Sequence, residues 1–163
     1  MGLGDSLPEE STTPEYRREW LERRRVVLAA HSWLGTKYHD CAFVKGHGVD
    51  CAYLLKGVFE DAGLVADVAI PKYSPQWYLH RDEEVYLGIV RSYMRDIDEA
   101  QAMPGDVVLY RFGRCYSHGA IIIEPGFPAV IHAYKQAGAV VLGEGASGDL
   151  KKRNRLFFSH WGR

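Results

Sequence analysis

The sequence predicts an α+β domain in which N-terminal helices pack on an antiparallel sheet of five strands. Apolar residues at helical spacing are concentrated before Pro104. Beyond Pro104-Gly105 the chain changes to short segments rich in β-branched and aromatic residues, separated by turns. Helices followed by strands, without regular alternation, are typical of the α+β class.

Length and composition narrow the functional classes. We expect all 163 residues to form one domain with a buried core, and residues 1–13 to be a loose polar tail. Twenty Lys and Arg against 21 Asp and Glu leave no positive excess for nucleic acid. No apolar run is long enough for a membrane, and no basic-then-apolar signal pattern precedes the first helix. We therefore expect synthesis in the cytoplasm and no membrane or nucleic-acid partner.

The first helix is predicted from Pro14 to about Leu34. Thr13 is a suitable N-cap before a proline at the first helical position, and Gly35 ends the helix. Five arginines lie in this segment, but glutamates alternate with them. A solvated, salt-bridged helix face is therefore a better interpretation than a nucleic-acid surface. The arginines are Arg17, Arg18, Arg23, Arg24 and Arg25.

A second helix is predicted to begin at Cys51, and the rest of the chain is organised around it. Asp50 is a good N-cap, and Gly63 lies where a left-handed residue would end the helix. Cys51 therefore lies in the first turn, where the helix dipole stabilises a thiolate. A nucleophile needs a histidine partner. Without one, a small buried thiol is the better interpretation, and Cys41 and Cys115 are interpreted as plain buried or loop thiols.

The segment between Gly63 and Pro104 is predicted to hold a short helix at Glu83–Tyr93. Before it, the aromatic stretch 73–78 is expected to be a loop packed over the surface. His80, with the charged residues 81–83, is interpreted as an anchor of that loop. Five strands follow, connected as an antiparallel meander. Their predicted bounds are Asp106–Phe112, His118–Glu124, Ala129–Tyr134, Ala139–Leu142 and Leu156–Trp161.

Two histidines, His118 and His132, lie in neighbouring strands of this sheet. Residues opposite each other in an antiparallel pair have numbers with a constant sum. A loop with an odd number of residues between the strands makes that sum even and places both imidazoles on one face, whereas a two-residue turn separates them. On one face, they complete a Cys–His–His set with Cys51.

The chemistry of such a set is cysteine hydrolysis. His118 takes the proton of the Cys51 thiol, and His132 holds the imidazole in the correct tautomer. We expect a thiolate–imidazolium pair, a thiol pKa well below its usual value and fast alkylation at mildly acidic pH. The backbone N–H of Cys51 and the hydroxyl of Tyr38 are the expected oxyanion donors. Asp50, like Tyr38, is assigned to oxyanion stabilisation or substrate binding.

Several segments resemble the NlpC-type cell-wall peptidases, over about residues 33–134. The matching segments are 33–38, 48–51, 104–109, 117–121 and 130–133. The resemblance implies a papain-like fold and hydrolysis of peptide stems of bacterial peptidoglycan without cofactor or metal. It also implies Cys51 as nucleophile, His118 as base and His132 as orienting residue. Ala52-Tyr53 stands where the family usually has Ser-Gly, so the cleft beside the helix is expected to be narrower or differently used.

The segments 45–51 and 77–84 look most like the branch of the family found in bacteriophage tails and prophages. This resemblance implies a role in cell-wall penetration, in a virion tail or at the cell wall, together with other tail proteins. Two alternatives keep the same fold: a structural tail protein without hydrolysis, and an acyltransferase that uses the same three residues.

A third alternative is a zinc site. Four thiophilic side chains fall within a short segment, which is enough in kind for zinc, but their spacing matches no usual structural-zinc pattern. They are His39, Cys41, His47 and Cys51.

Overall fold

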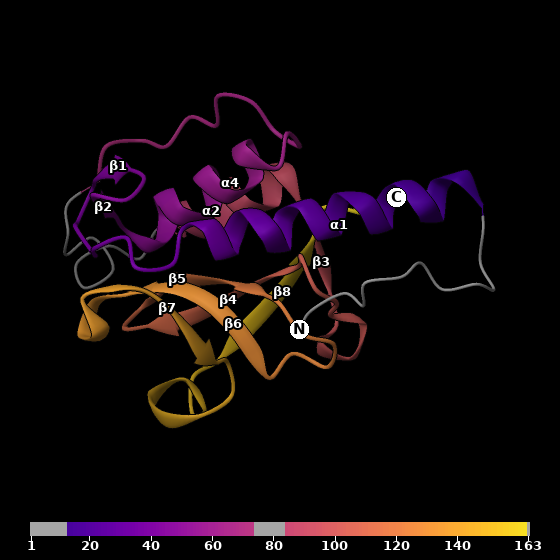
Figure 1. Cartoon of the computed structure of the whole chain (residues 1–163). Helices are drawn as coiled ribbons and strands as arrows, with labels where there is room; N and C mark the ends of the chain where they lie inside the picture. The colour runs from indigo at the N-terminus through magenta and orange to yellow at the C-terminus, as the bar shows by residue number, and fades with distance from the viewer. Residues whose placement is uncertain (1–12, 74–83, 163) are drawn as a thin grey trace.

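The computed structural model describes residues 13–73 and 84–162. Three helices lie over one face of an antiparallel sheet, as Figure 1 shows. They are α1 (Pro14–Ser32), α2 (Cys51–Asp61) and α4 (Val85–Tyr93). Several predicted features lie outside the described residues: the N-terminal tail, the aromatic loop from residue 74 onward and the anchor at His80. The first residue of the predicted third helix, Glu83, also lies outside them.

The first two helices begin as their sequences indicate. The Thr13 hydroxyl accepts from the N–H of Tyr16, and Pro14 occupies the first helical position. Asp50 accepts from the N–H of Tyr53 at the start of α2. Gly63 follows α2 with a φ of 70°, the left-handed conformation expected for the residue that ends the helix.

The main sheet has six strands, so the prediction of five was one short. The missed strand, β3 (Arg95–Ile97), is a three-residue edge strand against β8 (Arg155–Ser159). The other strands lie within a few residues of their predicted bounds. They are β4 (Val107–Phe112), β5 (Cys115–Ile122), β6 (Ala129–Tyr134) and β7 (Ala139–Glu144).

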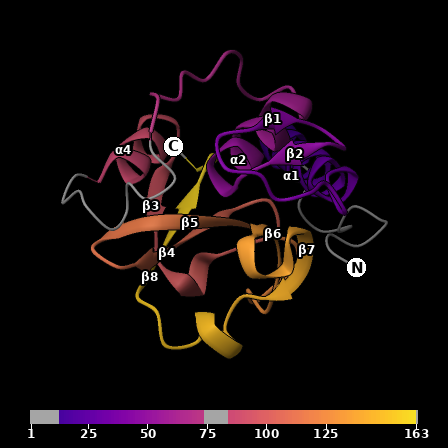
Figure 2. The ribbon, with the colours of Figure 1, turned by 90° about the vertical axis from the view of Figure 1, so that its left-hand side faces the viewer.

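The strand order is β3-β8-β4-β5-β6-β7, and every pair is antiparallel. Strands β4 to β7 form the predicted meander, whereas β8 returns across the sheet to pair with β4, as Figure 2 shows. A second, two-stranded sheet joins β1 (Phe43–Val44) to β2 (Gly48–Val49) just before α2. Helix α2 therefore follows directly from a tight hairpin.

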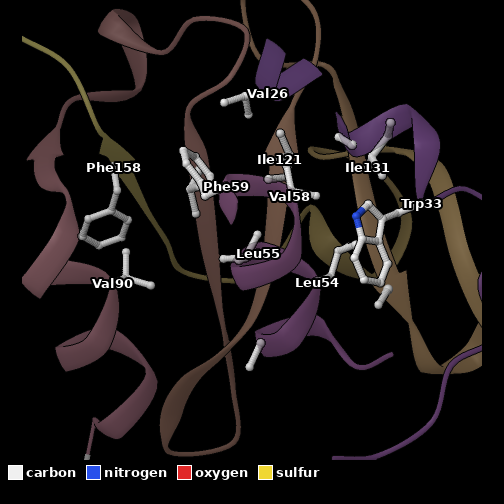
Figure 3. Packing of buried hydrophobic residues seen from close by; sticks show 14 of the residues in the cluster. Val26, Trp33, Leu54, Leu55, Val58, Phe59, Val90, Ile121, Ile131 and Phe158 are labelled. Carbon is white, nitrogen blue, oxygen red and sulfur yellow. The ribbon is translucent and has the colours of Figure 1, made fainter. Parts of the chain in front are cut away.

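The main core lies between the helices and the sheet (Figure 3). Leu54 and Val58 of α2 are fully buried and face Ile121 and Ile131 of the central strands. Burying a side chain of this size stabilises the fold by roughly 1.5–3 kcal/mol. Trp33, which follows α1, adds its indole to this layer and donates to Asp61 at the end of α2. The core fixes α2 on the sheet strands that carry the histidines.

Arg23 of α1 is buried, which corrects the prediction of a wholly solvated arginine face. Its guanidinium is 2.9 Å from Asp106 Oδ1, donates to the carbonyl oxygen of Pro104 and stacks over the ring of Trp161. Only 5% of the Arg23 side chain and 1% of the Asp106 side chain are exposed. Arg17, Arg18 and Arg25 remain exposed, as expected. Arg23 therefore ties α1 to the start of β4.

Candidate active site

Cys51 is held in the first turn of α2 by a dense set of hydrogen bonds around Asp50. The two carboxylate oxygens of Asp50 accept from the backbone N–H groups of Tyr53 (3.0 Å) and Cys41 (2.8 Å), and from the hydroxyl of Tyr73. The carbonyl of Cys51 accepts from the hydroxyl of Tyr86 at 3.0 Å. These contacts join three separate chain segments to the turn that carries the thiol.

His118 and His132 lie on the same face of the sheet. Ile121 pairs with Ile131 and Ile122 with Val130, so opposite residues have an even sum, and the loop between the strands has an odd number of residues. The parity prediction for the odd loop is confirmed: His118 Nε2 lies 2.8 Å from His132 Nδ1. Both side chains are buried.

This contact indicates which tautomer of His118 could accept a proton from a thiol. If His118 Nε2 carries a proton and donates to His132 Nδ1, the other nitrogen of His118, Nδ1, is free to accept a proton. The sulfur of Cys51 donates to the carbonyl oxygen of Ser117, the residue before His118, at 3.3 Å. Within the described residues, no hydrogen bond joins this sulfur to His118. In the resting structure the thiol is therefore hydrogen-bonded to the backbone next to His118 and not to its imidazole.

The pKa shifts of Cys51 and His118 disfavour the expected thiolate–imidazolium pair in the resting structure. Burial raises the pKa of the Cys51 thiol to about 12, and the Asp50 carboxylate adds to the rise. The N–H groups of Gly119, Cys51 and Ala52 lower this pKa, but by less. Burial also lowers the pKa of His118 to about 3 and that of His132 to about 4. The helix N-terminus and these N–H groups do not offset the loss of water.

We expect alkylation of Cys51 by iodoacetamide to be slow at pH 6 and to accelerate about tenfold for each pH unit up to pH 9. A raised pKa leaves the thiol protonated in this range, so the thiolate fraction grows with pH. Mass spectrometry of alkylated peptides separates Cys51 from the exposed Cys41, and the buried Cys115 is an unreactive control. A Cys51 rate that is already fast and constant between pH 5 and 7 would indicate the ion pair instead.

Cys51 and His118 open onto a common cleft of about 110 Å³. One wall comes from the loop before α2, with Tyr38 and Asp40. The opposite wall comes from the sheet, with Phe112 at the end of β4 and the segment 133–136 after His132. Lys135 and Asp40 form an ion pair of 3.1 Å between these walls. The cleft thus runs between the loop and the strand ends.

Tyr38 lines this cleft with Cys51, where an oxyanion donor is expected. In the resting structure its hydroxyl lies 3.3 Å from Asp40 Oδ1, and burial raises its pKa far above the ordinary value. The hydroxyl therefore stays protonated and can donate. Asp50, in contrast, accepts three hydrogen bonds with its carboxylate and has no proton to donate when ionised. Substrate contact by Asp50 stays a prediction.

We expect Tyr38→Phe to lower kcat on a peptidoglycan stem peptide by about 100- to 1000-fold, because one oxyanion donor is lost while the ring is kept. The melting temperature should change little, because the hydroxyl has one long contact with a partly exposed carboxylate. Tyr16→Phe on α1 is the matched control and should keep full activity. Unchanged turnover in Tyr38→Phe would leave Tyr38 as a packing residue only.

Several supporting residues were missed by the sequence analysis. Gly119 must be glycine, since a Cβ there would lie 2.3 Å from the hydroxyl of Tyr86. Gly143 on β7 leaves room for His132 in the same way, because a Cβ at Gly143 would lie 2.7 Å from His132 Nε2. Tyr73 caps the carboxylate of Asp50. These roles depend on contacts between distant segments, and no local pattern signals them.

Zinc ligation is not favoured by the geometry. In residues 13–73 and 84–162, no three His, Cys, Asp or Glu side chains come close enough together to hold a metal ion. The four thiophilic side chains of the loop and α2 are therefore not gathered as a ligand set.

Across the same ranges, no helix is both long enough and apolar enough to span a bilayer.

The fold matches solved structures with low sequence identity. Over 96% of this chain and 75% of the other, it matches the peptidoglycan hydrolase RipB from Mycobacterium tuberculosis, with a TM-score of 0.60 and 17% identity. Over 89% of this chain and 97% of the other, it matches the P60 domain of a Mycobacterium avium subspecies paratuberculosis antigen (TM-score 0.56, 20% identity).

NlpC2 from Trichomonas vaginalis matches over 94% of this chain with a TM-score of 0.62 and 14% identity, but this chain covers only 49% of it. No protein-family model matches the sequence, and no curated protein does either. The solved structures define a mixed α/β papain-like fold of the NlpC/P60 type, as the sequence predicts. At these identities they establish the fold alone.

Proposed function

We propose that this protein is a cysteine peptidase of the NlpC/P60 type that hydrolyses amide bonds in peptidoglycan stem peptides. The observation that supports it best is the 2.8 Å contact between His118 and His132 on the strands beside the first turn of α2. A cysteine at a helix N-terminus and a histidine line one cleft, and a second histidine contacts the first, which is the arrangement that cysteine hydrolysis needs. The likeness in fold to a peptidoglycan hydrolase supports the same substrate class.

The reaction begins from the neutral pair. As the substrate carbonyl enters the cleft, the sulfur of Cys51 turns from the carbonyl of Ser117 and attacks the acyl carbon, while its proton passes to His118 Nδ1. The imidazolium donates through Nε2 to His132 Nδ1, which stabilises the charge. Because burial disfavours the imidazolium, the proton is readily passed on to the leaving amine.

The oxyanion is then held by the backbone N–H of Cys51 and the hydroxyl of Tyr38. Collapse of the tetrahedral intermediate breaks the C–N bond and leaves a thioester on Cys51. Water, deprotonated by His118, attacks the thioester, and the carboxylate product leaves with Cys51 again protonated. No cofactor or metal is required by these steps.

The phage-tail assignment is part of the proposal and rests on the sequence resemblance of residues 45–51 and 77–84. Residues 77–83 lie outside the described part of the chain. In this setting the protein would act in a virion tail or at the cell wall, next to other tail proteins. Release of peptidoglycan fragments by phage particles that carry the intact protein, and not by particles that carry Cys51→Ala, would support this role.

Digestion of purified peptidoglycan tests the proposed activity. Wild type should release fragments whose masses correspond to cleavage within the stem peptides, and Cys51→Ala should release none. Addition of amine acceptors distinguishes acyl transfer, which would give amide-linked products in place of free carboxylates. If wild type releases nothing from peptidoglycan and does not cut soluble stem peptides, a structural role without hydrolysis takes precedence.

A further inference from the structure

A basic surface borders the catalytic cleft on the sheet side. It is formed by the turn between β4 and β5 and by the chain leading into β8. Its residues are Arg111, Arg114, Lys151, Lys152, Arg153 and Arg155. The protein as a whole has a net charge of −1, so this concentration of positive charge is local and is balanced elsewhere.

The two segments are held together by direct contacts. The N–H of Arg111 donates to the carbonyl of Asn154 at 2.9 Å, and Arg153 donates to the carbonyl of Arg111 at 3.3 Å. Tyr110 and Arg155 are opposite each other in the β4–β8 pair. In Figure 2 these strands run side by side. The basic surface is therefore a fixed feature at one end of the β4–β8 strand pair.

The surface keeps unpaired charge. Asp149 pairs with Arg153 and Glu99 with Arg155, and Glu84 accepts from the N–H of Tyr116 nearby. The side chains of Arg111, Lys151 and Lys152 are exposed and form no ion pair with the described residues. Unpaired exposed cations so close together repel one another in the free protein, and an anionic ligand removes that repulsion.

The surface also joins the cleft. The guanidinium of Arg153 lies 3.4 Å from the ring centre of Phe112, and Phe112 lines the cleft beside His118. A polymer bound on the basic surface would thus continue past Phe112 toward Cys51. Lys135, whose ion pair with Asp40 lies within the cleft, is separate from this surface.

We propose that the basic surface is an exosite that binds carboxylate groups of the peptidoglycan polymer and directs one of its stem peptides into the cleft. This inference rests on the proposed function, because it takes peptidoglycan as the substrate. At moderate salt, exposed cations mainly attract an anionic polymer to the protein and align it on the surface. At high salt, this attraction is screened. The exosite should therefore affect polymeric peptidoglycan and not a small soluble peptide.

Binding to insoluble peptidoglycan tests the exosite. The probe is peptidoglycan treated with hydrofluoric acid to remove phosphate polymers, and all proteins carry Cys51→Ala so that they do not digest it. Lys151→Glu with Lys152→Glu should weaken binding by about tenfold or more at low salt, with the difference largely lost at about 0.5 M salt. Arg17→Glu with Arg18→Glu on α1 is the matched control, with an equal change in net charge, and should bind within about twofold of the parent. Amidation of the peptidoglycan carboxylates should abolish the difference in binding between the parent and the variant with Lys151→Glu and Lys152→Glu.

Three results would overturn the exosite: equal binding by the two double variants, binding only to peptidoglycan that retains its phosphate polymers, and preferential binding to DNA. Catalysis is tested apart from it. With Cys51 intact, Lys151→Glu with Lys152→Glu should cleave a soluble stem peptide with unchanged kcat/KM and digest peptidoglycan more slowly. If neither this variant nor wild type cleaves the soluble peptide, the proposed hydrolysis fails, whereas the binding experiment still decides the exosite.

Discussion

Replacing His118 by alanine should lower kcat on a soluble stem peptide by about 10³- to 10⁴-fold. The pKa of Cys51 is raised by burial, so without the imidazole almost no thiolate forms at neutral pH. His132→Ala should cost less, because His118 keeps its basic nitrogen and loses only the contact that orients it. Steady-state kinetics with both variants, with unfolding checked by circular dichroism, measures this order.

His47→Ala is the control for these variants, since His47 is exposed in the turn between β1 and β2. It should keep kcat within about twofold of wild type. If His118→Ala retains a tenth or more of the wild-type kcat, or if it loses no more than His47→Ala, then His118 is not the base.

Asp106→Ala should destabilise the protein by about 3–5 kcal/mol, because it removes the buried carboxylate beside Arg23 and leaves only the partly exposed Glu19 to pair with the guanidinium. Burial raises the pKa of Asp106 in spite of Arg23, which indicates how completely this pair is removed from water. The free energy of unfolding from urea titration should fall with little change in the m-value.

The matched control for this pair is Asp96→Ala. Asp96 pairs with Arg91 on the surface, where about half of each side chain is exposed, and such pairs contribute at most about 1 kcal/mol. Replacing Arg23 by Met together with Asp106 by Leu should cost less than Asp106→Ala alone, since no buried charge remains. Equal losses for Asp106→Ala and Asp96→Ala would show that the Arg23–Asp106 pair does not hold α1 on the sheet.

Local patterns were enough to place the elements that carry the site. The N-cap Asp50 and the terminal Gly63 bounded α2, and strand parity predicted that an odd loop would place His118 and His132 on one face. Both signals depend on neighbouring residues or on one hairpin, which is why they could be recognised without the structure. The strand β3 was missed because three residues are too few to give an alternating pattern.

What the sequence could not predict depends on burial and on distant contacts. Arg23 looks like its neighbours in the arginine cluster, and only the approach of Asp106 distinguishes it. The thiol of Cys51 has the helix N-terminus that normally lowers a pKa, but burial of the thiol outweighs it and raises the pKa. Tyr86 and Gly119 reach Cys51 only because α4 and β5 pack against the start of α2.

The central claim is that Cys51 forms a covalent acyl-enzyme with a stem peptide. Rapid quenching of the enzyme in acid after mixing with a soluble stem peptide, followed by intact-mass and peptide mass spectrometry, tests it directly. We expect a transient mass increase equal to the acyl part of the substrate, located on the peptide that contains Cys51 and absent in Cys51→Ala. Hydrolysis by Cys51→Ala at the wild-type rate, with no adduct on Cys51 in wild type, would contradict the account.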